Sequence, residues 1–265
     1  SRMVEHPDIN KIAFTGSTGV GRGIAAGAAQ TIKRVTLELG GKSASVVFAD
    51  ADIEKAAAAA PSAVFGNAGQ DCCARSRILV ESSQVDNFLA AMEEAVKAIR
   101  VGDPLDASTE MGPLISASHR EKVGSFVTGE EMVAFRGSAP DGPGYWFPPT
   151  VLAPMSNSDR ASREEIFGPV ACVIPFDGEE EAIRIANDTE YGLSGSIWTR
   201  DGGRALRVAR AIDTGVLSIN SNSSVRVSTP FGGFKQSGIG RELGPDALDH
   251  YTEVKNVFYS TEVTD

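Results

Sequence analysis

Strand-like and helix-like segments alternate along most of this 265-residue chain, and this alternation constrains the fold more than any other feature. Short apolar runs such as SVVF and ACVIPF are typical of buried strands in a parallel sheet. Residues 85–99 instead carry apolar side chains at helical spacing, which predicts a helix with one buried face. We therefore predict an α/β fold with a mostly parallel sheet and helices on its faces.

Turn residues and periodicity mark the individual elements. Strands are expected at residues 11–16, 34–41, 43–48, 77–81, 169–176, 193–199 and 215–220. Helices are expected at residues 17–30, 82–100, 179–187 and 202–212, and from Asp52 onward, where the Asp52 side chain suits an N-cap. Prolines and glycines predict a long surface connection over residues 101–114.

The charge and cysteine content narrow the class of protein. The formal net charge is −10, which argues against nucleic acid or an anionic membrane as the main partner. No apolar run reaches the ~20 residues that a membrane span needs. Three cysteines, two of them adjacent, do not form a disulfide framework and fit a reducing compartment, so a cytoplasmic location is expected.

A glycine-rich turn, FTGSTGVGRG, lies between an expected strand and an expected helix. Such a turn can bring backbone N–H groups and a helix N-terminus close to a phosphate. The match to the dinucleotide fingerprint is poor, because Gly19 and Gly21 fill its first two positions but Ile24 occupies the third. A dinucleotide interpretation would make Glu38 the ribose ligand, whereas a plain tight turn is the alternative.

The segment GNAGQDCCARSR, residues 66–77, places Cys72 and Cys73 side by side in a polar, glycine-rich loop. One of them could be a nucleophile in an exposed bend, or both could be small buried residues. We expect the Cys73 side chain to point away from that of Cys72, because neighbouring side chains diverge. No metal site is expected, since the three histidines are scattered and adjacent cysteines lack the C-x-x-C spacing.

Five blocks in the same order resemble the NAD(P)-dependent aldehyde dehydrogenase superfamily. They are FTGST, LELGGKS, the GQDC loop, EEIFGPV and PFGGFKQSGIGRELG, and the YTEVKNV segment is similar as well. The resemblance covers nearly the whole chain. It implies an aldehyde dehydrogenase-like catalytic domain with a mostly parallel sheet, plus a remnant of the Rossmann-like cofactor domain.

The resemblance also implies roles for single residues. Cys72 takes the position of the nucleophile, which forms a thiohemiacetal and then a thioester, and Glu38 takes that of the general base. The implied cofactor is NAD or NADP, held by Gly16, Ser17, Leu39, Glu165 and Phe167. Asp71, Cys73 and Phe231 are expected to line the substrate channel.

The same resemblance implies the organisation of the chain and its partners. Residues 1–40 are expected to be the end of the cofactor domain, residues 41–240 the catalytic domain, and residues 241–265 a tail with an oligomerisation strand at 252–260. A small-molecule aldehyde, a second copy of the chain and a separate amino-terminal half are the expected partners. Two alternatives remain: a catalytically silent assembly subunit, and a cofactor-independent thiol esterase that uses Cys72 and Glu38.

Overall fold

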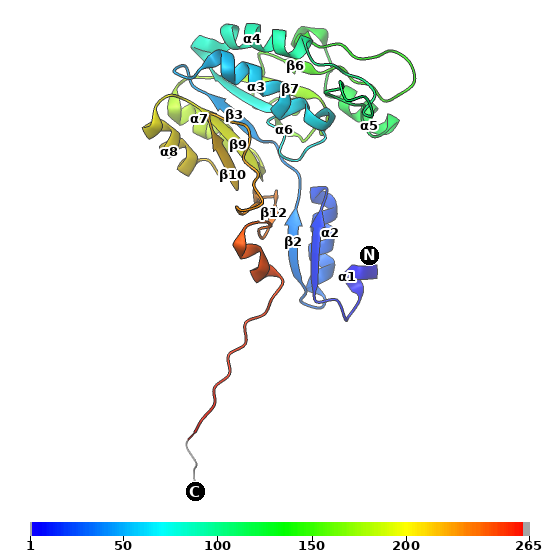
Figure 1. The fold of residues 1–265 in the computed structure, drawn as a ribbon, viewed down its shortest axis with the longest axis vertical. Helices are drawn as coiled ribbons and strands as arrows, with labels where there is room; N and C mark the ends of the chain where they lie inside the picture. The colour runs from blue at the N-terminus through cyan, green and yellow to red at the C-terminus, as the bar shows by residue number, and fades with distance from the viewer. Residues whose placement is uncertain (1, 262–265) are drawn as a thin grey trace.

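A computed structural model describes residues 2–261 and contains one large sheet, one small sheet and a two-stranded ribbon (Figure 1). The strands are β1 (Lys11–Thr15), β2 (Arg34–Glu38), β3 (Ala44–Val47), β4 (Arg77–Glu81), β5 (Val133–Arg136), β6 (Thr150–Leu152), β7 (Val170–Phe176), β8 (Tyr191–Gly192), β9 (Ser194–Trp198), β10 (Val216–Ile219), β11 (Phe234–Lys235) and β12 (Gly238–Ile239). The α-helices are α1 (Arg2–Glu5), α2 (Thr18–Ala29), α3 (Ile53–Phe65), α4 (Val85–Lys97), α5 (Ala117–Gly124), α6 (Arg160–Arg163), α7 (Gly178–Asn187) and α8 (Gly202–Ala211). The 3₁₀ helices are η1 (Gly66–Gly69), η2 (Ser82–Gln84), η3 (Glu130–Met132) and η4 (Pro245–His250). No helix within residues 2–261 combines the length and the apolar character that crossing a bilayer requires.

The large sheet has seven strands in the order β10-β9-β3-β4-β7-β6-β5. All neighbouring pairs are parallel except β5 with β6, so the predicted mostly parallel α/β fold is confirmed. Figure 1 shows α3 and α4 on one face of this sheet and α7 and α8 on the other, as right-handed crossovers in opposite directions along the sheet require. The apolar runs of β3, β4 and β7 are buried between these helix layers.

Local sequence signals explain several of these elements. The Asp52 side chain accepts a hydrogen bond from the Lys55 amide at 3.1 Å, which confirms the expected N-cap of α3. In α4 the periodic residues Phe88, Met92 and Val96 are fully buried, as the helical spacing predicts.

The small sheet has the order β1-β2-β12 and carries α2. β1 and β2 are parallel, and Gly238 of β12 pairs antiparallel with Glu38 of β2. The small sheet therefore takes a strand from residues 238–239, which the sequence assigns to the catalytic domain. The division into residues 1–40, 41–240 and 241–265 stays a prediction.

The chain beyond η4 extends away from the rest of the molecule (Figure 1). Residues 252–261 form no strand and are exposed, including Val254, Phe258 and Tyr259. The expected oligomerisation strand at 252–260 would take its partner from another copy of the chain, so it stays a prediction. Residues 262–265, which complete the expected tail, lie outside the described residues.

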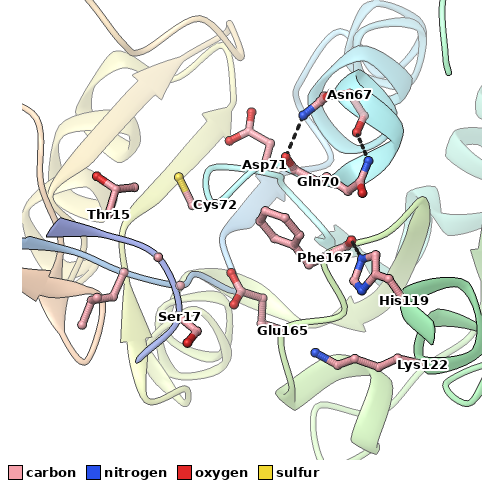
Figure 2. Close-up of a pocket in the computed structure, with 13 residues that line it drawn as sticks. Thr15, Ser17, Asn67, Gln70, Asp71, Cys72, His119, Lys122, Glu165 and Phe167 are labelled. Carbon is pink, nitrogen blue, oxygen red and sulfur yellow. Dashed lines mark hydrogen bonds between the residues drawn. The ribbon is translucent and has the colours of Figure 1, made fainter. Parts of the chain in front are cut away.

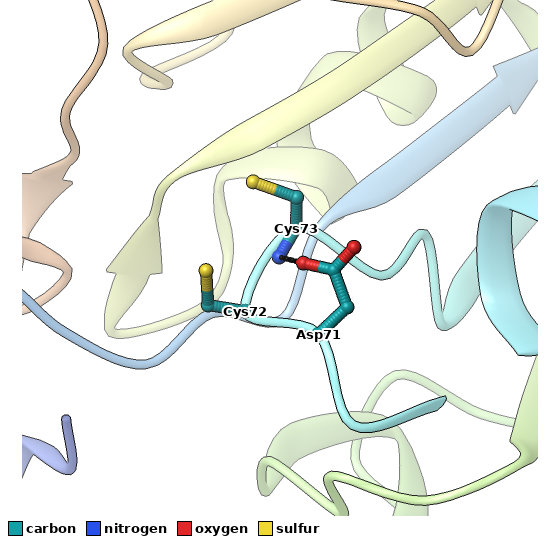
Figure 3. Close-up of side chains that lie close together, drawn as sticks. All are labelled: Asp71, Cys72 and Cys73. Carbon is teal, nitrogen blue, oxygen red and sulfur yellow. Dashed lines mark hydrogen bonds between the residues drawn. The ribbon is translucent and has the colours of Figure 1, made fainter. Parts of the chain in front are cut away.

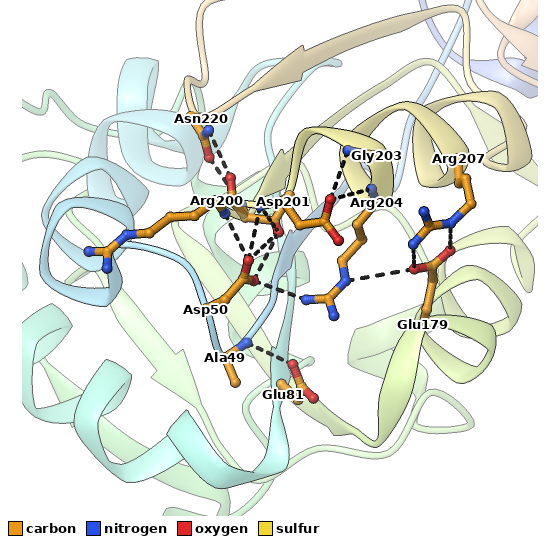
Figure 4. A network of polar contacts seen from close by, with 11 residues as sticks. Ala49, Asp50, Glu81, Glu179, Arg200, Asp201, Gly203, Arg204, Arg207 and Asn220 are labelled. Carbon is orange, nitrogen blue, oxygen red and sulfur yellow. Dashed lines mark hydrogen bonds and ion pairs between the residues drawn. The ribbon is translucent and has the colours of Figure 1, made fainter.

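One polar network ties the end of β3 to the start of α8 (Figure 4). The Asp50 carboxylate accepts hydrogen bonds from Thr199 Oγ1 at 2.8 Å and from the amides of Arg200 and Asp201 at 3.0 Å. It also forms an ion pair with Arg204 at 3.0 Å. Partial burial raises the pKa of Asp50, but these hydrogen bonds and the Arg204 charge outweigh it, so the pKa lies below its ordinary value.

Asp50→Asn is expected to lower the free energy of unfolding at pH 7 by about 1–2 kcal/mol, because charge-assisted hydrogen bonds are lost. The folded-state pKa is depressed, so the contribution is fully present above roughly pH 4, the unfolded value, and is lost as pH falls through the folded-state pKa. Urea unfolding of both proteins between pH 7 and pH 3 measures this. The exposed Asp141→Asn is the control, and equal losses in both variants would contradict the prediction.

Candidate active site

A cavity of about 580 Å³ lies where the small sheet meets the large sheet (Figure 2). Three stretches of its wall come from expected site segments: residues 15–17, residues 39–40 and the loop 67–72. The structure thus brings together seven residues that the sequence nominated for catalysis, cofactor or substrate: Gly16, Ser17, Leu39, Asp71, Cys72, Glu165 and Phe167. Glu38, Cys73 and Phe231 do not line it.

The N-terminus of α2 forms one side of the cavity. Ser17 is the N-cap of this 12-residue helix, and its hydroxyl accepts a hydrogen bond from the Val20 amide at 3.4 Å. Free N–H groups and the helix dipole at such an end favour an anionic ligand group. This wall therefore fits the pyrophosphate of a dinucleotide, although the G-x-G-x-x-G spacing is imperfect.

The loop that carries Cys72 is shaped by close backbone contacts. Asn67, Ala68 and Gly69 all have positive φ angles, between 53° and 69°. A Cβ at Gly69 would overlap the backbone of Gly168, and a Cβ at Gly41 would overlap the carbonyl oxygen of Cys72. The two glycine positions thus hold three motif segments against one another.

The sulfur atoms of the two adjacent cysteines lie on the same side of the loop and within 4.8 Å of each other, so the expected divergence of their side chains is wrong (Figure 3). The backbone turns at this point, because the Cys73 amide donates to Asp71 Oδ1 at 2.7 Å and the Ala74 amide to the Asp71 carbonyl at 3.1 Å. Side chains alternate sides in a strand but not in such a turn. Cys72 is partly exposed to the cavity, whereas Cys73 is buried.

This arrangement affects both thiols. The hydrogen bond between them, burial, and the negative charges of Cys73, Asp71 and Glu165 raise the pKa of Cys72. The pKa of Cys73 is lowered by the hydrogen bond from Cys72 and by the Arg75 charge, against its burial. The Cys72 thiol therefore keeps its proton at neutral pH unless a base or a nearby positive charge removes it.

Glu38 points away from the cavity, toward the segment that contains Phe231. A Cβ at Gly232 would lie 2.8 Å from Glu38 Oε1, and Phe231 forms a β-bridge with Glu242. Leu39 lines the cavity instead, because successive side chains at a strand end alternate sides. The structure thus separates Glu38 and Phe231 from the cavity and leaves their catalytic and substrate roles as predictions.

The environment of Glu38 is unusual for a carboxylate. It is 3% exposed, and neither oxygen has a hydrogen-bond partner among the described residues. Burial, together with the negative charge of Glu242, raises the pKa of Glu38 to about 8, against the opposing effect of Arg241. A carboxyl group with this pKa can exchange a proton near neutral pH.

Glu165 and Phe167 also line the cavity (Figure 2). Glu165 Oε1 accepts a hydrogen bond from the Gly41 amide at 2.8 Å. Burial raises the pKa of Glu165, whereas this hydrogen bond and the Lys122 charge lower it. Its carboxylate fits hydroxyl groups of a ribose, which are hydrogen-bond donors.

Sequence reasoning missed two residues that line the cavity, His119 and Lys122 of α5. His119 Nε2 lies 2.6 Å from the carbonyl oxygen of Phe167, whose φ of 57° is rare for a bulky residue. The i, i+3 spacing of His119 and Lys122 places both on one face of α5, but no motif in the sequence connects that face to the Cys72 loop.

Comparison with known proteins gives the family. The model of the "Aldehyde dehydrogenase family" matches residues 1–257. This chain belongs to the aldehyde dehydrogenase family. Geranial dehydrogenase of Castellaniella defragrans is 44% identical over 262 residues, with 97% of this chain and 55% of the relative covered. Betaine aldehyde dehydrogenase of Rhizobium johnstonii is 44% identical over 264 residues, with 97% and 54% covered.

Solved aldehyde dehydrogenase structures agree with the fold. The NAD-dependent aldehyde dehydrogenase from Sinorhizobium meliloti has a TM-score of 0.95 and 39% identity, covering 99% of this chain and 53% of that chain. The NAD+ complex of the Bacillus cereus aldehyde dehydrogenase has a TM-score of 0.93 and 41% identity, covering 98% and 54%. This chain spans about half the length of the curated aldehyde dehydrogenases that it matches.

Proposed function

We propose that this chain carries the catalytic part of an enzyme that oxidises an aldehyde to a carboxylic acid with NAD or NADP. The observation that carries this proposal is that Cys72 shares one cavity with the N-terminus of α2 and with Glu165 and Phe167. This reaction needs both a nucleophile and a binding surface for the dinucleotide. Relatives named as geranial and betaine aldehyde dehydrogenases support the reaction class.

In this proposal the sulfur of Cys72 attacks the aldehyde carbon and forms a thiohemiacetal. The Cys72 amide has no hydrogen-bond acceptor within residues 2–261, so it is free to donate to the developing oxyanion. Loss of hydride then leaves a thioester on Cys72. Since the hydrogen bond to Cys73 and burial raise the pKa of the Cys72 thiol, a base must take its proton before attack.

Several cavity residues would hold the cofactor. Ser17 and the first turn of α2 would bind the pyrophosphate, and Glu165 the hydroxyls of the nicotinamide ribose. Gly16, Leu39 and Phe167 would bound the ring. When bound, the nicotinamide supplies the hydride acceptor.

Glu38 would activate the water that hydrolyses the thioester. Its carboxyl group lies beside Gly232, at the end of β2. Gly41, three residues after Glu38, contacts the Cys72 carbonyl oxygen. Asp71, Cys73 and Phe231 would contribute to the substrate channel.

We also propose a cytoplasmic enzyme that associates through its tail. The exposed apolar residues Val254, Val257, Phe258 and Tyr259 support pairing of residues 252–260 with a sheet of another copy. This chain matches only about half of each relative. Residues that correspond to the other half, such as a separate amino-terminal half, would bind the adenosine end of the cofactor.

The test is formation of reduced nicotinamide by this chain with NAD or NADP and a small aliphatic aldehyde. Turnover that needs both the cofactor and the aldehyde is expected. Hydrolysis of an ester without cofactor, combined with no aldehyde oxidation, would instead support the thiol esterase. Absence of both activities in a folded chain would contradict an independent enzyme, and the assay would then be repeated with an added amino-terminal half.

A further inference from the structure

The turn at residues 71–73 gathers three side chains that can bind a metal. One carboxylate oxygen of Asp71 and the sulfur atoms of Cys72 and Cys73 all lie within 4.8 Å of one another. Figure 3 shows the two sulfur atoms on the same side of the loop. The sequence predicts no metal site here, because the histidines are scattered and adjacent cysteines lack the C-x-x-C spacing, but the turn brings the three ligand atoms together without that spacing.

The turn is held in this shape by its surroundings. The Cys73 amide bonds Asp71 Oδ1, so the carboxylate is fixed beside the backbone of the two cysteines. Behind the turn, the buried Arg75 donates hydrogen bonds to the Cys73 carbonyl and to Ser224 Oγ. The three ligand atoms are therefore preorganised, which reduces the entropic cost of binding a cation.

The donor set selects the class of cation. Two thiolates and one carboxylate are typical ligands of Zn²⁺ and of softer divalent ions, and they leave a fourth position for water. Hard cations such as Mg²⁺ prefer oxygen ligands alone.

Access is provided by the cavity. Cys72 and Asp71 line it, while Cys73 lies just behind Cys72. Lys122 on the same wall and Arg75 behind the turn are the nearby positive charges, and Arg75 is engaged by backbone and hydroxyl oxygens. A cation can therefore reach Asp71 and the Cys72 sulfur from the cavity and exchange its bound waters for these ligands.

We propose that Asp71, Cys72 and Cys73 form a binding site for a thiophilic divalent cation such as Zn²⁺ or Cd²⁺. Occupation ties up the sulfur lone pair that would attack an aldehyde, so the cation is an inhibitor. The inhibition rests on the proposed function, whereas the binding does not.

Cd²⁺ alone is the probe, added to the full chain without nicotinamide cofactor or aldehyde. The charge-transfer absorption of Cd–thiolate bonds reports binding, and far-ultraviolet circular dichroism verifies that each variant is folded. A single Cd²⁺ per chain is expected. Cys73→Ser should weaken binding roughly tenfold or more and halve the absorption, and the exposed Asp71→Asn should weaken it several-fold. Cys172→Ser, which changes the remaining cysteine, should bind as the wild type does.

A second readout needs no variant. Bound Cd²⁺ should protect the partly exposed Cys72 from alkylation by iodoacetamide, as measured by peptide mass spectrometry, and EDTA should remove the protection. Equal affinity of wild type and Cys73→Ser, or alkylation unaffected by Cd²⁺, would overturn the site. Because neither readout uses turnover, Cd²⁺ binding without aldehyde oxidation would reject the proposed function alone, and the reverse would reject the cation site alone.

Discussion

Cys72→Ala is expected to lower the rate of aldehyde oxidation by roughly 10³-fold or more, because no other described side chain of the cavity can form a thioester. The cavity should keep its cofactor wall in this variant, since Ser17, Glu165 and Phe167 do not depend on the sulfur. The measurement is the initial rate of reduced nicotinamide formation at saturating aldehyde, together with cofactor affinity from quenching of protein fluorescence.

Cys172→Ser is the matched control for this prediction. Cys172 is fully buried in β7, and its thiol lies 3.3 Å from the Ala161 carbonyl oxygen, a contact that a serine hydroxyl can keep. Its activity should stay close to that of the wild type. If Cys72→Ala retained more than about a tenth of the wild-type rate while Cys172→Ser did not, the assignment of the nucleophile would be wrong.

Glu38→Gln is expected to lower steady-state turnover by roughly 10²–10⁴-fold, the range that general base catalysis supplies. The amide keeps the shape of the side chain but cannot accept a proton from water. Thioester formation should survive better than its hydrolysis, so the variant should show a rapid burst of reduced nicotinamide followed by slow turnover. Rapid-mixing absorbance measurements separate the two phases.

The pH dependence gives this prediction a sharper form. A base works when deprotonated, and the pKa of Glu38 is raised to about 8, so wild-type hydrolysis should increase with pH and level off above about pH 8. The hydrolysis rate of Glu38→Gln should lack this increase with pH, which is the rising limb of the pH–rate profile. Glu242→Gln removes a negative charge that raises the pKa of Glu38, so it should move the limb to lower pH. An unchanged profile in both variants would exclude Glu38 as the base.

Much of the fold could be predicted because local signals and packing agree. The apolar runs of β3 and β7 demand burial on both faces, and only a parallel sheet with two helix layers provides it. The antiparallel strand β5 at the edge could not be predicted in this way. It follows the short helix η3 in a segment that lacks strand alternation, and pairing with β6 determines it.

In the candidate site, too, local sequence signals predicted some residues and tertiary structure placed the others. Motif positions identified Gly16, Cys72 and Glu165 in one cavity, because the motifs contact one another through glycines. The direction of the Cys73 side chain depends on a turn, and that of Glu38 on a strand end. At both places a shift of one residue changes the side to which the side chain points, so the motifs alone do not predict it. His119 and Lys122 were missed since only tertiary packing brings α5 to Phe167.

The strand order has a consequence for how the chain is made. β3 and β4 are neighbours in both sequence and space, so they can pair early, but the other edge of β3 waits for β9, about 150 residues later in the chain. At roughly 5–20 residues per second, a ribosome leaves that apolar edge without its partner for about 8–30 seconds. During this interval the nascent chain exposes an apolar strand with an unpaired edge, to which other chains can add. Chaperones that cover such edges should therefore raise the yield of folded protein more than any change at the surface of the finished molecule.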